Sequence, residues 1–346
     1  MYDEYTSPTH NSINHGTDVA MKDGRKVDNS LIREPKSSPK ASESGPRRLQ
    51  VPADREGQRL DNFLLSQLAV PKSLIYRLLR KGAIRVNGKR SKPADRLQGG
   101  EEIRLPMLIQ EQRQPGEVPK PVLEIAGTIG LYEDSDFLIV DKPSGWAAHS
   151  GSGLDWGLIE VMRQARGEAT LELAHRLDRA TSGVSILCRS RQGLKSFHDA
   201  LRDNKVEKKY LALLCNAESR SAWTADLPLL KGSGKGNQPQ VTVDNAGQGA
   251  VSHFKVLEHF SNATLVEVTI ETGRMHQIRV HAKATSSALA GDDRYGDKAE
   301  VKLFRDLGLR RLFLHCSSMG FEGPGGQVIA HAPLPEELGV VLDSLP

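Results

Sequence analysis

The chain has 346 residues, of which 38% are hydrophobic and 26% are charged, and its formal net charge is +4 at pH 7. A chain of this length can bury one large core and carry a smaller second domain. No stretch approaches the ~20 consecutive apolar residues that cross a bilayer, and residues 1–46 lack the apolar core of a signal peptide. The cysteines Cys188, Cys215 and Cys316 are far apart and lack CxxC spacing, so we expect buried, reduced thiols in a cytoplasmic protein.

The sequence divides into four parts that differ in composition. Residues 1–50 are rich in Ser, Pro, Asn, Lys and Asp and contain no aromatic residue after Tyr5, which predicts a disordered tail. Residues 51–106 form a compact basic module, and residues 107–121, rich in Gln and Pro, predict a linker. We expect residues 122–346 to form the large domain.

The basic module begins with helices and continues with strands. Apolar residues at helical spacing over 60–68 and over 74–79 predict two short amphipathic helices. Residues 84–86 predict a strand that ends at Asn87-Gly88, a strong two-residue hairpin turn, and residues 102–105 predict a further strand.

Positive charge is concentrated in this module. Residues 51–110 contain 12 Lys or Arg against 6 Asp or Glu, so the rest of the protein is slightly acidic. A run of charge is usually a solvated face. Here the charge continues from the second helix into the hairpin on one surface, which is typical of contact with a phosphate backbone. The candidate RNA-binding residues are Lys72, Arg77, Arg80, Lys81, Arg85, Lys89 and Arg90.

The module also resembles a known RNA-binding unit. The order Arg59-Leu60-Asp61, Phe63-Leu64 and Arg80 to Gly88 is similar to the alpha-L module. That module is shared by a primary rRNA-binding ribosomal protein, a class of tyrosyl-tRNA synthetases and several RNA-modifying enzymes. The resemblance covers about the whole module and implies a small α/β fold that binds RNA.

In the large domain we expect a strand pair over residues 131–140, a buried strand over 209–214 and a strand over 264–271. A helix is expected to begin near Met275, with His276, Arg279 and Lys283 on one face. His276 and His281 are five residues apart, which is not the spacing of a zinc-binding helix, so no metal site is expected.

The segment from His175 to Gly183 is the strongest candidate for an active site. It places the carboxylate of Asp178 between Arg176 and Arg179 in a turn of small residues. Neighbouring guanidinium groups favour the ionised form, which suits a base or a nucleophile. Alternatively, an Asp in a Thr-Ser-Gly turn accepts hydrogen bonds from its own backbone.

Six segments in order resemble one family, the RluA-type pseudouridine synthases. They are Asp141 to Gly145, His175 to Gly183, Lys209 to Ala212, Gly273 to His281, Gly291 to Gly296, and Leu312 to His315. The amino-terminal module fits the larger members that act on rRNA. The segment from His149 to Leu154 looks most like the C-type subgroup, which modifies several uridines of large-subunit (23S) rRNA.

The resemblance implies an α+β fold with a long mixed, largely antiparallel sheet, and an isomerisation of uridine to pseudouridine that needs no cofactor or metal. It implies that Asp178 is the catalytic carboxylate, either by covalent attack or by removing a ribose proton. Tyr210 would stack on uracil and be placed to take the carbon 5 proton, and Arg279 would pair with Asp178. Arg176 would fill the space left by the flipped nucleotide, and Leu314 would line the substrate site.

Other functions fit the sequence less well. A protein kinase is excluded, since no Asp-Phe-Gly, nucleotide-binding glycine loop or strand lysine motif accompanies residues 175–178. A noncatalytic rRNA-binding assembly factor is the main alternative, and the joint presence of Asp178, Tyr210 and Arg279 argues against it. An N-glycosidase would release free uracil. The expected partner is ribosomal RNA, with the Gly-, Ser- and Lys-rich residues 231–240 as a loop near it, and we expect a monomer without membrane contact.

Overall fold

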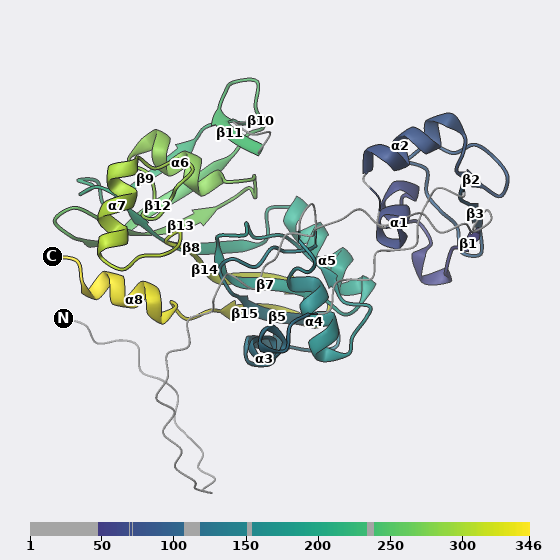
Figure 1. The fold of residues 1–346 in the computed structure, drawn as a ribbon, viewed down its shortest axis with the longest axis horizontal. Helices are drawn as coiled ribbons and strands as arrows, with labels where there is room; N and C mark the ends of the chain where they lie inside the picture. Colours follow the sequence, from purple (N-terminus) through teal and green to yellow (C-terminus); the bar gives the residue numbers. More distant parts are fainter. Residues whose placement is uncertain (1–47, 69, 71, 107–117, 151–153, 234–238) are drawn as a thin grey trace, which may run out of the picture. The chain divides into compact units, whose positions relative to one another are not determined.

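The computed structural model describes residues 48–68, 70, 72–106, 118–150, 154–233 and 239–346 (Figure 1). The tail expected over residues 1–47, most of the expected linker and the middle of the expected 231–240 loop lie outside these ranges. Within them, no helix has both the length and the apolar character needed to span a membrane.

The basic module has the two helices and the hairpin turn that the sequence predicts. Its elements are β1 (Arg48–Gln50), a 3-10 turn (Ala53–Arg55), α1 (Leu60–Gln67), α2 (Lys72–Lys81), β2 (Arg85–Val86) and β3 (Glu102–Arg104). The strands form an antiparallel sheet in the order β1-β3-β2. Leu60, Leu64, Ile75 and Ile103 are fully buried in one core, which explains the helical spacing of the apolar residues.

The first strand corrects the predicted boundary of the tail. Composition assigns Arg48–Gln50 to the disordered segment, but this stretch pairs with β3, with Leu49 opposite Ile103. Leu49 packs against the core of the module. A strand of three residues carries no readable alternation, and it is ordered by a partner more than fifty residues away. The module therefore begins no later than Arg48.

The large domain is built on a ten-stranded mixed sheet. Its path is β4-β5-β7-β14-β8-β13-β12-β9, with β15 paired to β14 and β6 to β7. The pair β7–β14 is parallel and the other described pairs are antiparallel, as the expected fold class requires. The strands are β4 (Gly130–Glu133), β5 (Phe137–Lys142), β6 (Glu172–Leu173), β7 (Ser182–Cys188), β8 (Glu207–Leu214), β9 (Ala222–Asp226), β12 (Val251–His259), β13 (Thr264–Ile270), β14 (Leu314–Gly323) and β15 (Gly326–His331). A separate hairpin joins β10 (Leu229–Ser233) to β11 (Pro239–Val243).

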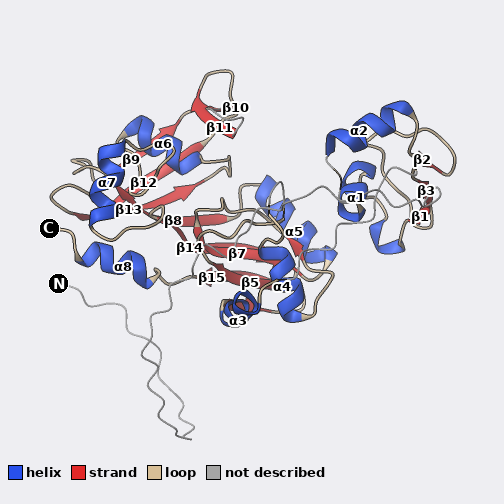
Figure 2. Ribbon diagram, in the orientation of Figure 1, coloured by secondary structure: helices blue, strands red, loops and turns tan. Residues whose placement is uncertain are grey.

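Helices pack on the sheet, as Figure 2 shows in blue against red strands. They are α3 (Lys120–Thr128), α4 (Leu158–Arg166), α5 (Arg191–Arg202), α6 (Gln277–Thr285), α7 (Lys298–Asp306) and α8 (Glu336–Asp343). Phe137 and Ile139 of β5 share a core with Phe197 of α5, whereas Leu138 and Val140 share a core with α3 and α4. Both faces of β5 are covered, which explains its continuous apolar run.

The end of the expected linker is also corrected. Val118 is buried against α3 and α4, and α3 begins at Lys120, inside the range 107–121 that the sequence assigns to the linker. Pro119 precedes the helix and Pro121 lies in its first turn, where proline is well tolerated because the missing N–H has no partner there. Prolines that indicate a linker by composition here begin a helix.

The cysteines are unpaired. Cys188 and Cys316 are buried as predicted, but Cys215 is only partly buried. Burial raises the pKa of each thiol to about 12, so none is a thiolate at neutral pH.

Candidate active site

Asp178 lies in the loop between β6 and β7, and a second loop holds that loop in place. Gly145 N–H donates to the Arg179 carbonyl at 2.8 Å, and Arg179 Nε donates back to the Gly145 carbonyl at 2.9 Å. Ser144 Oγ donates to the Ala180 carbonyl at 2.8 Å. The segment after β5 therefore stabilises the turn that carries Asp178 through these hydrogen bonds.

The side chain of Lys142 connects these two loops. Its side chain is fully buried, and Nζ donates to the carbonyls of Pro143 and Trp146, both at 2.9 Å, and to that of Arg179 at 3.4 Å. Burial lowers its pKa to about 7, with Arg311 acting in the same direction and Asp178 opposing it. The Asp141 to Gly145 segment thus has a scaffolding function in the site.

Gly183 allows the parallel strands to meet just beyond the loop. Its φ is +109°, and a Cβ there would lie 2.1 Å from the carbonyl oxygen of Cys316. Gly183 and Cys316 face each other in the β7–β14 register, which brings the start of β14 beside the Asp178 loop. Only glycine combines this φ with so close an approach.

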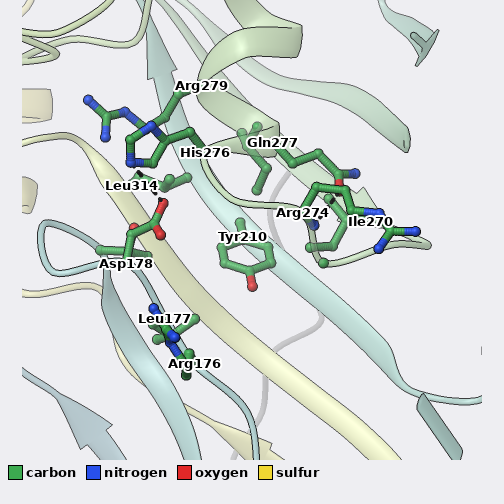
Figure 3. Close-up of a pocket in the computed structure, with 13 residues that line it drawn as sticks. Arg176, Leu177, Asp178, Tyr210, Ile270, Arg274, His276, Gln277, Arg279 and Leu314 are labelled. Carbon is green, nitrogen blue, oxygen red and sulfur yellow. Dashed lines mark hydrogen bonds and ion pairs between the residues drawn. The ribbon is translucent and has the colours of Figure 1, made fainter. Parts of the chain in front are cut away.

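One pocket collects the five residues that the sequence predicts for catalysis and substrate binding. Arg176 and Asp178 come from the loop, Tyr210 from β8, Arg279 from α6 and Leu314 from β14 (Figure 3). The other lining residues are Leu177, Thr181, Ile270, Gly273, Arg274, His276, Gln277 and Ile278. Residues that are up to 138 positions apart in sequence therefore surround one cavity.

Both polar and apolar groups line this pocket. Arg176 is exposed, and the Asp178 side chain is 32% accessible. Tyr210 and Leu314 are buried and supply an apolar surface. Burial raises the pKa of Tyr210 well above its ordinary value, with Cys316 and Asp178 acting in the same direction, so its hydroxyl is protonated at neutral pH.

The predicted pairing of Arg279 with Asp178 is found only as an attraction between their charges, because the hydrogen bonds of Arg279 go to another carboxylate. Arg279 makes a bidentate ion pair with Asp292, with Nε–Oδ2 at 2.7 Å and Nη2–Oδ1 at 2.6 Å. Both side chains are almost completely buried, and a buried guanidinium needs a carboxylate that matches both its N–H groups. Arg279 still lines the pocket, but its hydrogen bonds go to Asp292.

Asp292 and His276 have contacts that the sequence does not reveal. Asp292 Oδ1 accepts hydrogen bonds from the N–H groups of Arg294 and Tyr295, both at 3.0 Å. The segment from Gly291 to Gly296 resembles the family in sequence, but that resemblance gives no role to Asp292 or Tyr295. The group that faces Asp178 is His276, with Nε2 3.9 Å from Oδ2. His276 precedes α6 rather than lying on it, because the helix begins at Gln277.

The basic residues of the module lie where RNA could reach them. Arg77, Arg80 and Lys81 are exposed on one face of α2, while Ile75 and Leu79 are buried on the other. Arg85, Lys89 and Arg90 are exposed around the hairpin turn. The side chain of Lys72 lies outside the described part of the structure.

No group of three or more His, Cys, Asp or Glu residues in the described ranges is arranged to hold a metal ion. The pocket supplies a carboxylate, an imidazole, guanidinium groups and a phenol. Side chains of these kinds can perform general acid–base or nucleophilic catalysis.

Comparison with known proteins identifies the family. Residues 136–284 match the family described as RNA pseudouridylate synthase, and residues 58–103 match the S4 domain. "Ribosomal large subunit pseudouridine synthase C" of Escherichia coli strain K12 is 43% identical over 303 residues, 85% of this chain and 95% of that protein. The chain belongs to the RNA pseudouridine synthase family. The protein of the same name from Haemophilus influenzae is 40% identical over 316 residues, 90% of this chain and 98% of its own length.

The fold agrees with solved structures of the family. "Human RNA Pseudouridylate Synthase Domain Containing 1" superposes with a TM-score of 0.54 at 23% identity and covers 64% of this chain and 89% of its own. "Human RNA Pseudouridylate Synthase Domain Containing 4" gives a TM-score of 0.54 over 65% of this chain. The basic module that resembles the alpha-L unit is the S4 domain. The protein is thus a pseudouridine synthase with an S4 domain, and catalysis is favoured over the role of a noncatalytic assembly factor.

Proposed function

We propose that this enzyme converts uridine to pseudouridine at defined positions of large-subunit (23S) rRNA, in the cytoplasm and as a monomer. The names of relatives that align over nearly their whole length support the choice of rRNA. The observation that carries the proposal is the convergence of Asp178, Tyr210 and Arg279 on one pocket in a chain of this family.

The reaction breaks the bond from ribose C1′ to N1 of uracil, turns the base and forms a bond from C1′ to C5. The C5 proton leaves and N1 gains a proton, so product and substrate are isomers. We propose Asp178 as the catalytic carboxylate, acting either by attack on the ribose or by removal of a ribose proton. This assignment is supported by the partial exposure of the Asp178 side chain in the pocket, where a ribose could reach the carboxylate.

The other pocket residues are proposed to bind the flipped nucleotide. A base within folded RNA has to leave its stack before chemistry can occur. Arg176 is exposed at the pocket and is proposed to fill the space that the flipped nucleotide leaves. Its guanidinium can stack on the neighbouring bases or donate hydrogen bonds to phosphates. Tyr210 and Leu314 offer an apolar surface against which uracil can stack. Arg279, held in place by its ion pair with Asp292, forms part of the pocket wall.

We propose a division of labour in which the S4 module, residues 48–106, adds affinity for rRNA and residues 118–346 perform catalysis. The proposal is supported by the exposed cationic face of α2 and the turn that follows it. Phosphate contacts hold RNA in place without reading its sequence. We therefore assign Arg77, Arg80, Lys81, Arg85, Lys89 and Arg90, together with Lys72, to RNA binding.

Replacing Arg77, Arg80 and Lys81 together by Gln in the full chain should weaken rRNA binding and lower its salt dependence. The log–log slope of affinity against salt should fall by roughly one for each phosphate that the variant no longer binds. The single-turnover rate at saturating RNA should stay the same, because the pocket is unaltered. Binding of an rRNA fragment at several salt concentrations measures the effect.

A matched control replaces three exposed cations of α7, Lys298, Lys302 and Arg305, by Gln. These residues do not line the pocket. Equal loss of affinity in both triple variants would show that net charge, rather than the α2 face, drives binding.

The substrate itself is tested by mapping pseudouridines in the rRNA and tRNA of cells with and without the gene. The expected result is the loss of specific pseudouridines from large-subunit rRNA and their return when the gene is restored. Loss only in tRNA or small-subunit rRNA would contradict the proposed substrate. Release of free uracil by the purified enzyme would instead indicate an N-glycosidase.

A further inference from the structure

His276 has an unusual backbone conformation beside the catalytic loop. Its φ is +55° and its ψ is +18°, which is the left-handed region. The other described non-glycine residues with positive φ are Asn87 and Asn204, and asparagine adopts this region more readily than histidine does. Such a conformation persists where surrounding contacts enforce it, and it is concentrated at functional sites. The contacts of the His276 ring show which arrangement this backbone conformation holds in place.

The imidazole lies between two oxygen atoms and is hydrogen-bonded to one of them. Nε2 faces Asp178 Oδ2 at 3.9 Å, and Nδ1 lies 2.7 Å from the hydroxyl oxygen of Tyr295. The same hydroxyl oxygen accepts a hydrogen bond from the N–H of Val241 at 3.2 Å. With that acceptor site used, the hydroxyl proton can be donated to Nδ1. The proton of the neutral ring is then on Nε2, the nitrogen that faces Asp178.

Tyr295 is itself held on several sides. Its ring contacts that of His276 edge-on, with centroids 5.5 Å apart, and the guanidinium of Arg279 lies 5.0 Å from its centroid. Its N–H donates to Asp292, which also binds Arg279. Tyr295 packs against a small core that contains Val241 of β11 and Val280 of α6. The hydroxyl therefore has little freedom to leave the position from which it reaches His276.

Burial of the ring favours its neutral form, against the attraction of Asp178. Burial lowers the pKa of His276; Arg279 and Arg294 act in the same direction, while Asp178 and Asp292 oppose them. A neutral imidazole can donate from Nε2 to Asp178 without adding a cation to the pocket. It would orient the carboxylate and leave its negative charge available to the substrate.

We propose that His276 and Tyr295 form a positioning pair for Asp178, in which the Tyr295 hydroxyl sets the tautomer of His276 and His276 Nε2–H orients the carboxylate. The inference rests on the proposed role of Asp178. In the resting structure the 3.9 Å separation is longer than a hydrogen bond, and we expect it to shorten when uridine enters the pocket. Val241 connects the pair to the β10–β11 hairpin, so that the packing of this hairpin contributes to the position of Asp178.

The pair of variants His276→Gln and His276→Asn separates positioning from backbone support. The Gln side-chain nitrogen is as many bonds from Cα as Nε2 and can reach Asp178. Asn ends at the distance of Nδ1, so it can reach Tyr295 but not Asp178, and it adopts the left-handed region more readily. Positioning predicts that Gln retains more activity, with Asn about 10- to 100-fold slower than the parent in single turnover at saturating RNA. RNA affinity should stay within about twofold for both.

If the only role of His276 is to adopt the left-handed conformation before α6, Asn should be the better replacement. An Asn variant as fast as the parent therefore overturns the proposal. Tyr295→Phe provides a second test that leaves the backbone and ring in place. It should lower the single-turnover rate by about tenfold without weakening RNA binding, because the hydroxyl no longer fixes the tautomer. Tyr132→Phe is its matched control, since that hydroxyl donates to Asp134 at 2.8 Å outside the pocket.

Asp178→Asn is measured in the same series to distinguish two kinds of failure. An inactive Asp178→Asn enzyme together with an unaffected Tyr295→Phe enzyme would overturn the positioning pair alone. An active Asp178→Asn enzyme would overturn both the role of Asp178 and the pair that serves it.

Discussion

Asp178→Asn is expected to lower the rate of isomerisation by at least about a thousandfold, while RNA affinity stays within about twofold of the parent. Asparagine has the same shape as aspartate but does not ionise, so it can neither attack the ribose nor accept a proton from it. The contacts proposed to hold RNA lie on other residues, mainly on the S4 module. Tritium release from uracil labelled at C5, under single-turnover conditions, measures the rate.

The control for this variant is Asp203→Asn, an exposed carboxylate just after α5 that does not line the pocket. It should behave as the parent enzyme does. An Asp178→Asn enzyme within tenfold of the parent rate would contradict the assignment of the catalytic carboxylate. A comparable loss of RNA binding would mean that Asp178 contributes to affinity.

The strands that the sequence predicts, β2 to β5, β8 and β13, are set by local patterns, whereas the other described strands are not predicted. The apolar run of β5 and the alternation of β13 are readable without knowledge of their neighbours. Asn87 and Gly88 have φ values of +48° and +75°, and the N–H of Lys89 donates to the Val86 carbonyl, as expected for the predicted tight turn. Local stereochemistry determines these features.

The incorrect predictions fall at positions whose structure depends on long-range contacts. Arg48–Gln50 becomes a strand through pairing with β3, and Val118 is buried by α3 and α4. The composition around these residues is that of a tail and a linker, and nothing local indicates their partners. Tertiary contacts override composition at both boundaries.

The candidate site shows the same division. Family motifs indicate its five predicted residues, and the structure brings all five to one pocket. Which carboxylate pairs with which guanidinium depends on geometry that motifs do not contain. Asp178 and Asp292 are both candidates by charge, but only Asp292 meets Arg279 with two hydrogen bonds. The contact of His276 with Tyr295 requires the left-handed turn before α6, which no pattern of residue types reveals.

Tyr210→Phe is expected to lower the isomerisation rate by about a hundredfold without weakening RNA binding. Phenylalanine keeps the ring that is proposed to stack on uracil, so only the hydroxyl is removed. The variant should fold normally, because the hydroxyl carries no charge at neutral pH and its removal leaves no buried ion unpaired. Single-turnover formation of pseudouridine and tritium release from C5 are measured together at saturating RNA.

The environment of Tyr210 determines what this result would mean. Burial raises the pKa of the phenol well above its ordinary value, so in the free pocket the hydroxyl is protonated. A phenol that accepts the C5 proton has to release its own in the same step, and phenylalanine can do neither. A Phe variant as fast as the parent would therefore remove the hydroxyl from the proton transfer and leave Tyr210 as a stacking surface. A loss of RNA affinity equal to the loss of rate would mean that the hydroxyl binds substrate in its ground state.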